Sequence, residues 1–186
     1  SAVDNSLAFF EAEGMRATYF VIAADIDDPD KRAALARVVA AGHGIASHGL
    51  HHAYLDRIDR DGKHAEVVTS KAKIEDALGV PCHGFRAPGY SIDFESLEMV
   101  AEAGYRYDSS LFPTYEFQQR LGLQRLLPEP FHVLPGRDLV EIPLPSLGPW
   151  LPPFHPCYAF YLTAYYFRLG VASARKRTRY LTKIGR

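Results

Sequence analysis

Two histidines, His48 and His52, are the residues whose type and spacing most directly indicate chemistry in this sequence. Residues four apart on a helical turn lie on one side of it, so both imidazoles can reach the same divalent ion. Neutral imidazole suits zinc and its first-row neighbours. His51, three residues after His48, could serve instead by geometry, and a polar surface loop would explain the same cluster. The pair therefore indicates a metal site and leaves these alternatives open.

Two more charged residues follow short β-prone runs. Arg86 precedes Ala-Pro-Gly-Tyr, in which the proline and glycine fix a turn and aim the guanidinium. Arginine forks onto carboxylates, so a buried Arg86 would orient a catalytic aspartate, whereas a surface arginine beside a turn is the alternative. Asp108 precedes two serines, and it would either support another functional residue or cap that turn. For Asp108 alone the sequence favours the cap.

The elements that would position these residues repeat one order: an amphipathic helix, a glycine that ends it, and a β-prone run. The glycines are Gly14, Gly42, Gly79 and Gly104, and the runs after them are 17–22, 44–47, 80–85 and 105–107. Asp4 and Asp93 are expected to cap the first and fourth helices. This alternation predicts βαβ units and a parallel sheet or barrel. The carboxyl ends of parallel strands converge, so His48, Arg86 and Asp108 should meet at one rim.

Residues 113–186 are predicted to be loop-rich, because proline is frequent there, with one strand at 139–142 and a C-terminal helix from about 158 to 176. Residues 150–167 hold eight aromatic side chains, and residues 168–186 hold seven basic and no acidic ones. Such a segment suits peripheral contact of residues 150–186 with an anionic membrane that carries a lipid-linked sugar. An aromatic core helix with a solvated basic end is the alternative.

Composition sets the class of protein. The 186 residues fit one domain, and 47% of them are apolar, which is enough for a sizeable core. Lysine and arginine total 21 against 22 acidic residues, so no overall field indicates a nucleic-acid partner. Two cysteines are too few for a disulfide framework or a four-thiolate metal site. No signal peptide is found in the sequence, which leaves cytoplasm and cell envelope open, and nothing indicates the oligomeric state.

Three motifs in register resemble one family. Residues 42–52, Gly-His-Gly-Ile-Ala-Ser-His-Gly-Leu-His-His, resemble the metal-binding motif of the NodB-homology polysaccharide deacetylases, the family four carbohydrate esterases. Residues 86–90, Arg-Ala-Pro-Gly-Tyr, resemble its arginine-proline motif, and residues 104–110 resemble the motif after that. Residues 9–21 are similar to the helix and strand that follow the family's first motif. The order and spacing agree up to residue 112, which favours a single deacetylase-like domain over residues 1–186 with 1–112 matched.

The resemblance implies an α/β fold, a distorted (β/α) barrel that holds one divalent metal, usually zinc, by an Asp-His-His triad. It implies that metal-bound water removes N-acetyl groups from an amino sugar or glycan, with a carboxylate as base and a late histidine as acid. His48 and His52 carry over as metal ligands. Arg86 and Asp108 carry over as catalytic-site residues, Arg86 to position the base and Asp108 to support it. Tyr90 carries over as a substrate-binding residue.

Two motifs of the family are not found in the sequence. The Asp-Asp strand that supplies the base and the third ligand should precede residue 1, and the closing Leu-His motif is missing, since Phe154-His155-Pro156 is a poor substitute. We therefore expect a barrel that is incomplete at both ends. Gly49 stands where the family has serine or threonine. The alternatives to a deacetylase are a catalytically inactive relative that binds glycan, and a deformylase or amidase on the same barrel.

Overall fold

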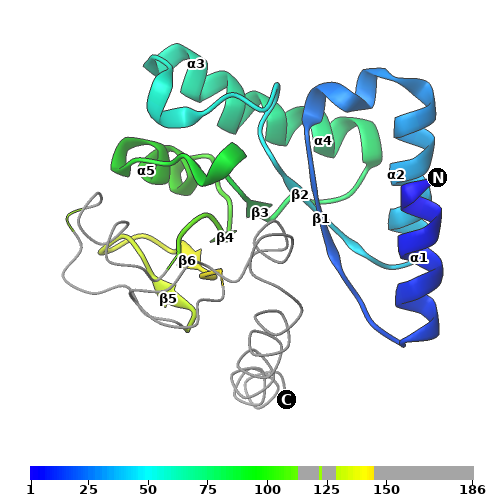
Figure 1. Cartoon of the computed structure of the whole chain (residues 1–186). Coiled ribbons are helices and arrows are strands. Elements are labelled where there is room, and N and C mark those ends of the chain that lie inside the picture. Colours follow the sequence, from blue (N-terminus) through cyan, green and yellow to red (C-terminus); the bar gives the residue numbers. More distant parts are fainter. Residues whose placement is uncertain (113–121, 123–128, 145–186) are drawn as a thin grey trace, which may run out of the picture.

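The computed structural model describes residues 1–112, 122 and 129–144, and within them it forms a sheet flanked by helices (Figure 1). The six strands lie in the order β1-β2-β3-β4-β6-β5. They are β1 (Thr18–Val21), β2 (Gly44–Ser47), β3 (Gly84–Phe85), β4 (Tyr107–Asp108), β5 (Phe131–His132) and β6 (Val140–Glu141). All neighbours pair in parallel except β5 and β6, which are antiparallel. The predicted α/β class and parallel sheet are therefore confirmed.

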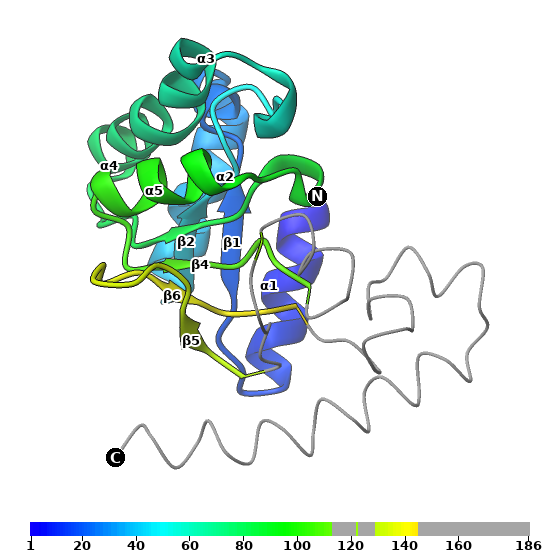
Figure 2. The same cartoon turned by 90° about the vertical axis from the view of Figure 1, so that its left-hand side faces the viewer.

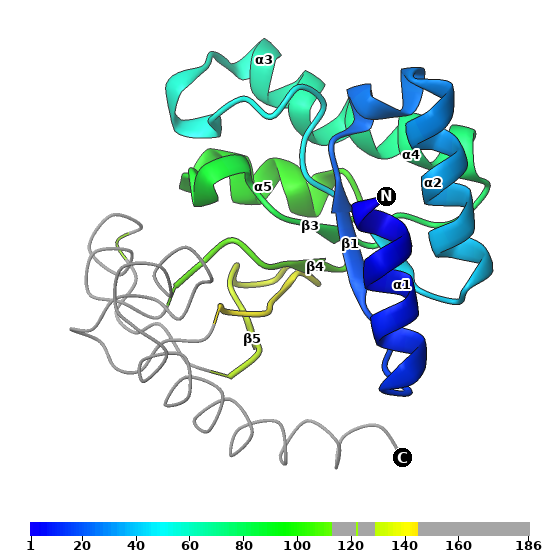
Figure 3. The same ribbon diagram turned by 45° about the vertical axis from the view of Figure 1, so that its right-hand side comes forward.

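Each parallel connection in the first part of the chain passes through helix. The helices are α1 (Ala2–Ala12), α2 (Pro29–Ala40), α3 (Arg60–His64), α4 (Ser70–Leu78) and α5 (Phe94–Glu102). A π-helical turn, η3 (Ala65–Thr69), joins α3 to α4, and short 3-10 turns occupy Ala23–Asp27, Leu55–Arg57 and Pro88–Tyr90. Helices α1 and α2 run side by side next to β1, whereas β5 and β6 form the opposite edge of the sheet (Figures 2 and 3).

The core lies between the sheet and these helices. Leu35 and Val38 of α2, Ile74 of α4, and Leu97 and Val100 of α5 are all buried. They repeat at helical spacing, so each helix presents one apolar stripe to the sheet, and α2 and α4 both pack against β2. Each such side chain contributes about 1.5–3 kcal/mol when fully buried. This packing fixes the strand ends that carry the candidate site.

Helix ends mostly follow the predicted signals. The four glycines expected to end the helices, Gly14, Gly42, Gly79 and Gly104, all adopt positive φ, at 62°, 77°, 64° and 77°. Asp93 caps α5, because its carboxylate accepts the Ser96 N–H. The expected cap at Asp4 is wrong: Ser1 caps α1, and Asp4 sits three residues inside it and completes a capping box.

Two differences concern the sheet. The third strand pairs only at the end of the predicted run 80–85, and the fourth begins at the last residue of the predicted run 105–107 and extends one residue beyond it. Strand β5 was missed, since two residues are too few to show alternation in the sequence. The predicted helix at 158–176 and the membrane-contact segment 150–186 lie outside the described residues. None of the helices in the described part has the length and apolar character to cross a membrane.

Candidate active site

The loop after β2 brings the two predicted ligands together. The ring centroids of His48 and His52 lie 5.0 Å apart with an interplanar angle of 80°. The helical turn assumed for this pair is wrong, because residues 48–52 form an irregular loop in which Gly49 has φ 83° and His52 has φ 64°. These two left-handed residues fold the loop back, so the rings meet without a helix. It is His52 rather than His51 whose ring contacts His48.

The tautomer of His48 is set by a backbone contact. Its Nδ1 lies 2.7 Å from the Arg86 carbonyl oxygen, which can only accept, so Nδ1 carries the proton and Nε2 keeps a lone pair. Burial lowers the pKa of His48, which favours the neutral ring that a metal requires. A ligating histidine usually donates its other N–H in this manner. The donor chemistry of His48 therefore fits a divalent metal ion.

A buried carboxylate accepts two backbone hydrogen bonds from the same loop. Glu66, 3% exposed and placed on the π-helical turn η3, accepts the Leu50 N–H at 2.8 Å and the His51 N–H at 2.9 Å. A Cβ on Gly49 would lie 2.3 Å from Glu66 Oε2. Positive φ and this close approach explain why glycine, which has no Cβ, suits position 49. π-helical turns are often found at functional sites, and here the turn aims one carboxylate at two amides.

Arg86 follows β3 and is anchored to the next strand end. Its Nε donates to the Ser109 carbonyl at 2.8 Å and its Nη2 to the Ser109 hydroxyl at 2.7 Å. The guanidinium carbon lies 3.9 Å from the centroid of the Phe20 ring on β1, a cation–π contact. Burial lowers the pKa of Arg86, yet an arginine stays charged. Arg86 is thus a half-buried cation that is held at the rim by two hydrogen bonds.

Asp108, the last residue of β4, is fully buried. Its oxygens accept the Ser110 N–H at 3.0 Å and the Ser110 hydroxyl at 2.8 Å, so the turn-capping interpretation is confirmed. The Ser110 hydroxyl in turn accepts the Ala87 N–H at 2.9 Å. A side chain with no exposed surface cannot touch a substrate. Asp108 thus holds Ser110, which in turn binds the Ala87 N–H next to Arg86.

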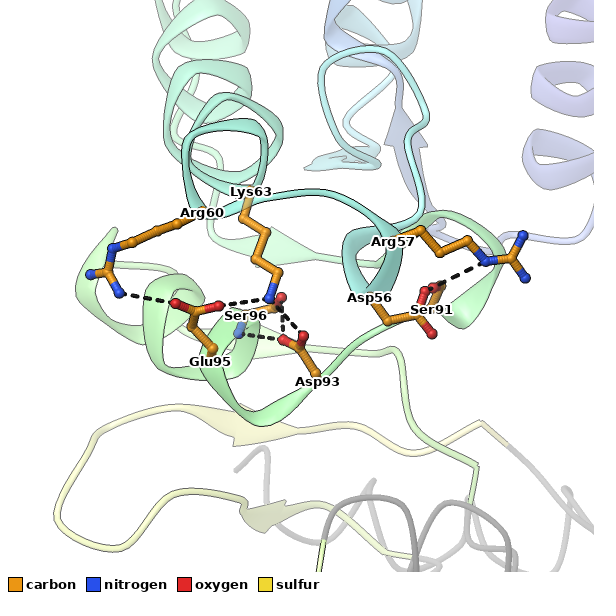
Figure 4. A network of polar contacts seen from close by, with 8 residues as sticks. All are labelled: Asp56, Arg57, Arg60, Lys63, Ser91, Asp93, Glu95 and Ser96. Carbon is orange, nitrogen blue, oxygen red and sulfur yellow. Dashed lines mark hydrogen bonds and ion pairs between the residues drawn. The ribbon is translucent and has the colours of Figure 1, made fainter.

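Tyr90 ends the 3-10 turn that follows Arg86. Tyr90 has φ 57°, is half-buried, and packs its ring 4.7 Å from that of Phe112. The next residue, Ser91, donates a hydrogen bond to Asp56 in the 3-10 turn that follows the histidines (Figure 4). The exposed Tyr54 ring lies 6.3 Å from the His52 ring, measured between centroids. The histidine loop and the arginine loop are thus tied together.

Ion pairs and hydrogen bonds also join α3 to the start of α5. Lys63, only 6% exposed, reaches Asp93 at 2.6 Å and Glu95 at 2.7 Å, and Arg60 also pairs with Glu95 (Figure 4). Burial alone would raise the pKa of Asp93, but hydrogen bonds from Lys63 and Ser96 outweigh it and hold that pKa below its usual value. The network fixes the start of the helix that leads to Glu66.

The family model for polysaccharide deacetylases matches residues 1–107. The chain belongs to the polysaccharide deacetylase family. No curated protein matches it. Among solved structures, it is similar to a polysaccharide deacetylase from Mycobacterium smegmatis described as putative, with 25% identity, a TM-score of 0.62, and coverage of 78% of this chain and 46% of that one.

Two more deacetylase-fold structures show the same architecture. The Streptococcus pyogenes deacetylase PplD, solved with acetate, has 14% identity and a TM-score of 0.57 over 84% of this chain and 62% of its own. A CE4 family pseudoenzyme from Bacillus anthracis has 16% identity and a TM-score of 0.51 over 54% and 35%. The chain thus spans about half the length of the first solved deacetylase relatives. These likenesses show the fold of the family and include one inactive member.

The loops around the candidate residues also contain four polar side chains that the sequence did not single out: Glu66, Ser109, Ser110 and Glu141. Glu141 had a visible signal, an acid inside the apolar run 139–142. Glu66 had none, because its burial depends on the π-helical turn. Within the described part of the chain, no group of three or more histidine, cysteine or acidic side chains gathers around a common point. His48 and His52 are the only two of the predicted ligand residues that the described structure brings together.

Proposed function

We propose that this polysaccharide deacetylase chain belongs to a metal-dependent hydrolase that removes N-acetyl groups from an amino sugar or glycan. The observation that carries the proposal is the His48 contact: Nδ1–H is held by the Arg86 carbonyl, Nε2 keeps its lone pair for a metal, and the His52 ring lies 5.0 Å from the His48 ring, measured between centroids. A metal bound there would polarise the acetyl carbonyl and lower the pKa of water. Zinc is the first choice, because both donors are imidazoles.

The remaining side chains are suited to orientation. Two of the five N–H groups of Arg86 are used on Ser109, so others remain for the carboxylate that would act as base. Because Phe20 and Ser109 immobilise the guanidinium, such a carboxylate would be held in one orientation. Tyr90 is our candidate for the substrate-binding side chain, since it stands on the loop that carries Arg86.

The test measures metal content and acetate release on the full-length protein. We expect wild type to bind one zinc and to release acetate from N-acetylated glycans. The His48→Ala/His52→Ala variant should lose both. His51→Ala is the matched control, because His51 contributes its backbone N–H to Glu66 and its side chain is exposed. Equal zinc in wild type and the double variant would refute the assignment.

Other results would select the alternatives. Glycan binding without zinc or acetate release would indicate an inactive relative, as among the solved structures. Release of formate or ring opening of a cyclic amide, without acetate, would indicate a deformylase or amidase.

A further inference from the structure

Two carboxyl groups face each other below the rim on neighbouring strands. Asp108 of β4 and Glu141 of β6 are register partners in the parallel sheet, and both are 0% exposed. Arg86 is the cation that acts on both. Two buried carboxylates against one arginine would leave a net negative charge out of water, which is costly. The ionisation of this pair therefore needs an explanation.

The hydrogen bonds of Asp108 and Glu141 explain how the pair is ionised. Asp108 accepts from the Ser110 N–H and hydroxyl, and Glu141 Oε1 accepts the Leu111 N–H at 3.0 Å. Glu141 Oε2 is buried and is left without a partner when both groups are counted as acceptors. A proton on Oε2 would make it a donor to Asp108, with which Glu141 is in hydrogen-bond contact. Burial raises the pKa of both groups, but Asp108 already accepts two donors and is the better anion, and the Asp108 charge raises the pKa of Glu141 further.

The pair lies at the start of a continuous path to His48. Asp108 holds the Ser110 hydroxyl, which accepts the Ala87 N–H at 2.9 Å. Ala87 follows Arg86, whose carbonyl accepts His48 Nδ1–H. Ser109, between Asp108 and Ser110, accepts from the Arg86 guanidinium and donates its hydroxyl proton to the Ile142 carbonyl at 2.8 Å. The path joins β6 to the imidazole and the guanidinium through side chains and turns of fixed geometry.

We propose that Glu141 is a positioning residue that remains a neutral acid, donates its proton to Asp108, and thereby holds the turn 108–110 on which Arg86 and His48 depend. The positive charge of Arg86 is then balanced by one carboxylate, that of Asp108. If Glu141 were ionised, Arg86 would face two carboxylates, and its attraction for another anion at the rim would fall. The positioning role of Glu141 rests on the proposed function, whereas the protonation of its carboxyl group does not depend on that function.

The test uses three variants of the full-length protein. Glutamine has the shape of a protonated glutamate, with an oxygen for the Leu111 N–H and an N–H for Asp108, whereas alanine removes both. Leu139→Ala is the control, because it makes a cavity in the same segment, at a buried apolar side chain two residues before Glu141 that offers Asp108 no hydrogen bond. We expect Glu141→Ala to weaken zinc binding about tenfold, the low end of what outer hydrogen-bond partners contribute. Glu141→Gln should restore the wild-type affinity, and Leu139→Ala should lower stability alone.

Two spectroscopic readouts decide the proposal without zinc. At pH 7 the infrared spectrum of wild type should contain the carbonyl band of a buried protonated carboxylic acid, and Glu141→Gln should remove it. The NMR signal of the His48 Nδ1 proton should move in Glu141→Ala and stay in place in Leu139→Ala. An absent band, or a glutamine variant as damaged as the alanine variant, would overturn the inference. If wild type binds no zinc while the band and the His48 shift are observed, the proposed function fails and the positioning role stands.

Discussion

Glu66 offers the sharpest test of how the histidine loop is held. Its two oxygens accept two backbone N–H groups, from Leu50 and His51, at 2.8 and 2.9 Å. Glutamine at this position keeps one acceptor oxygen and turns its amide NH2 group toward the other backbone N–H. One charge-assisted bond, about 1.5–3 kcal/mol, would be lost, and a partly buried donor would be left unsatisfied at up to about 1–3 kcal/mol. Some relaxation of the loop is to be expected, so we predict that Glu66→Gln lowers the free energy of unfolding by about 2–4 kcal/mol.

Two measurements check this value. Urea unfolding gives the loss in the free energy of unfolding. Amide hydrogen exchange at Leu50 and His51 should be accelerated relative to wild type, and by more than at residues in α2. Glu98→Gln is the control, because Glu98 is exposed on α5 and its replacement should change stability by less than about 0.5 kcal/mol. Zinc affinity should also fall in Glu66→Gln. A loss below about 0.5 kcal/mol with unchanged exchange would refute the argument that this carboxylate anchors the loop.

Three further variants test neighbouring contacts. Gly49→Ala should be destabilising, because residue 49 has φ 83° and its Cβ would lie 2.3 Å from the Glu66 carboxylate. The losses in unfolding free energy of Gly49→Ala and Glu66→Gln, measured in urea, should therefore not be additive. Gly84→Ala should cost about 1–3 kcal/mol, since a Cβ there would lie 2.1 Å from the ring of Tyr107, and a melting temperature equal to wild type would contradict it. Lys63→Met should reduce stability by about 1–2 kcal/mol at pH 7. The folded pKa of Asp93 is depressed, so the stability it contributes is present above about pH 4 and is lost as pH falls through the folded pKa. In Lys63→Met the unfolding free energy should therefore depend less on pH below about 4, and an unchanged acid profile would argue against this pairing.

The order of helices, glycines and parallel strands could be predicted from local patterns, because apolar spacing and left-handed glycines act over a few residues. Gly14, Gly42, Gly79 and Gly104 all adopt the expected backbone. Strand lengths could not be predicted, because pairing depends on the neighbouring strand. Asp4 was misjudged as a cap because serine three residues earlier competes for the same role.

The sequence by itself determined which residues reach the rim: His48, Arg86 and Asp108 each follow a strand, and parallel strands end on one side. Only the tertiary structure decided what these residues do there. The distance from His48 to the Arg86 carbonyl, the two amides on Glu66, and the buried contact of Asp108 with Glu141 all join segments far apart in the chain. Tautomer, ionisation and orientation depend on burial and on partners across such distances. Spacing along the chain therefore indicates the candidate ligands, and packing sets their chemical state.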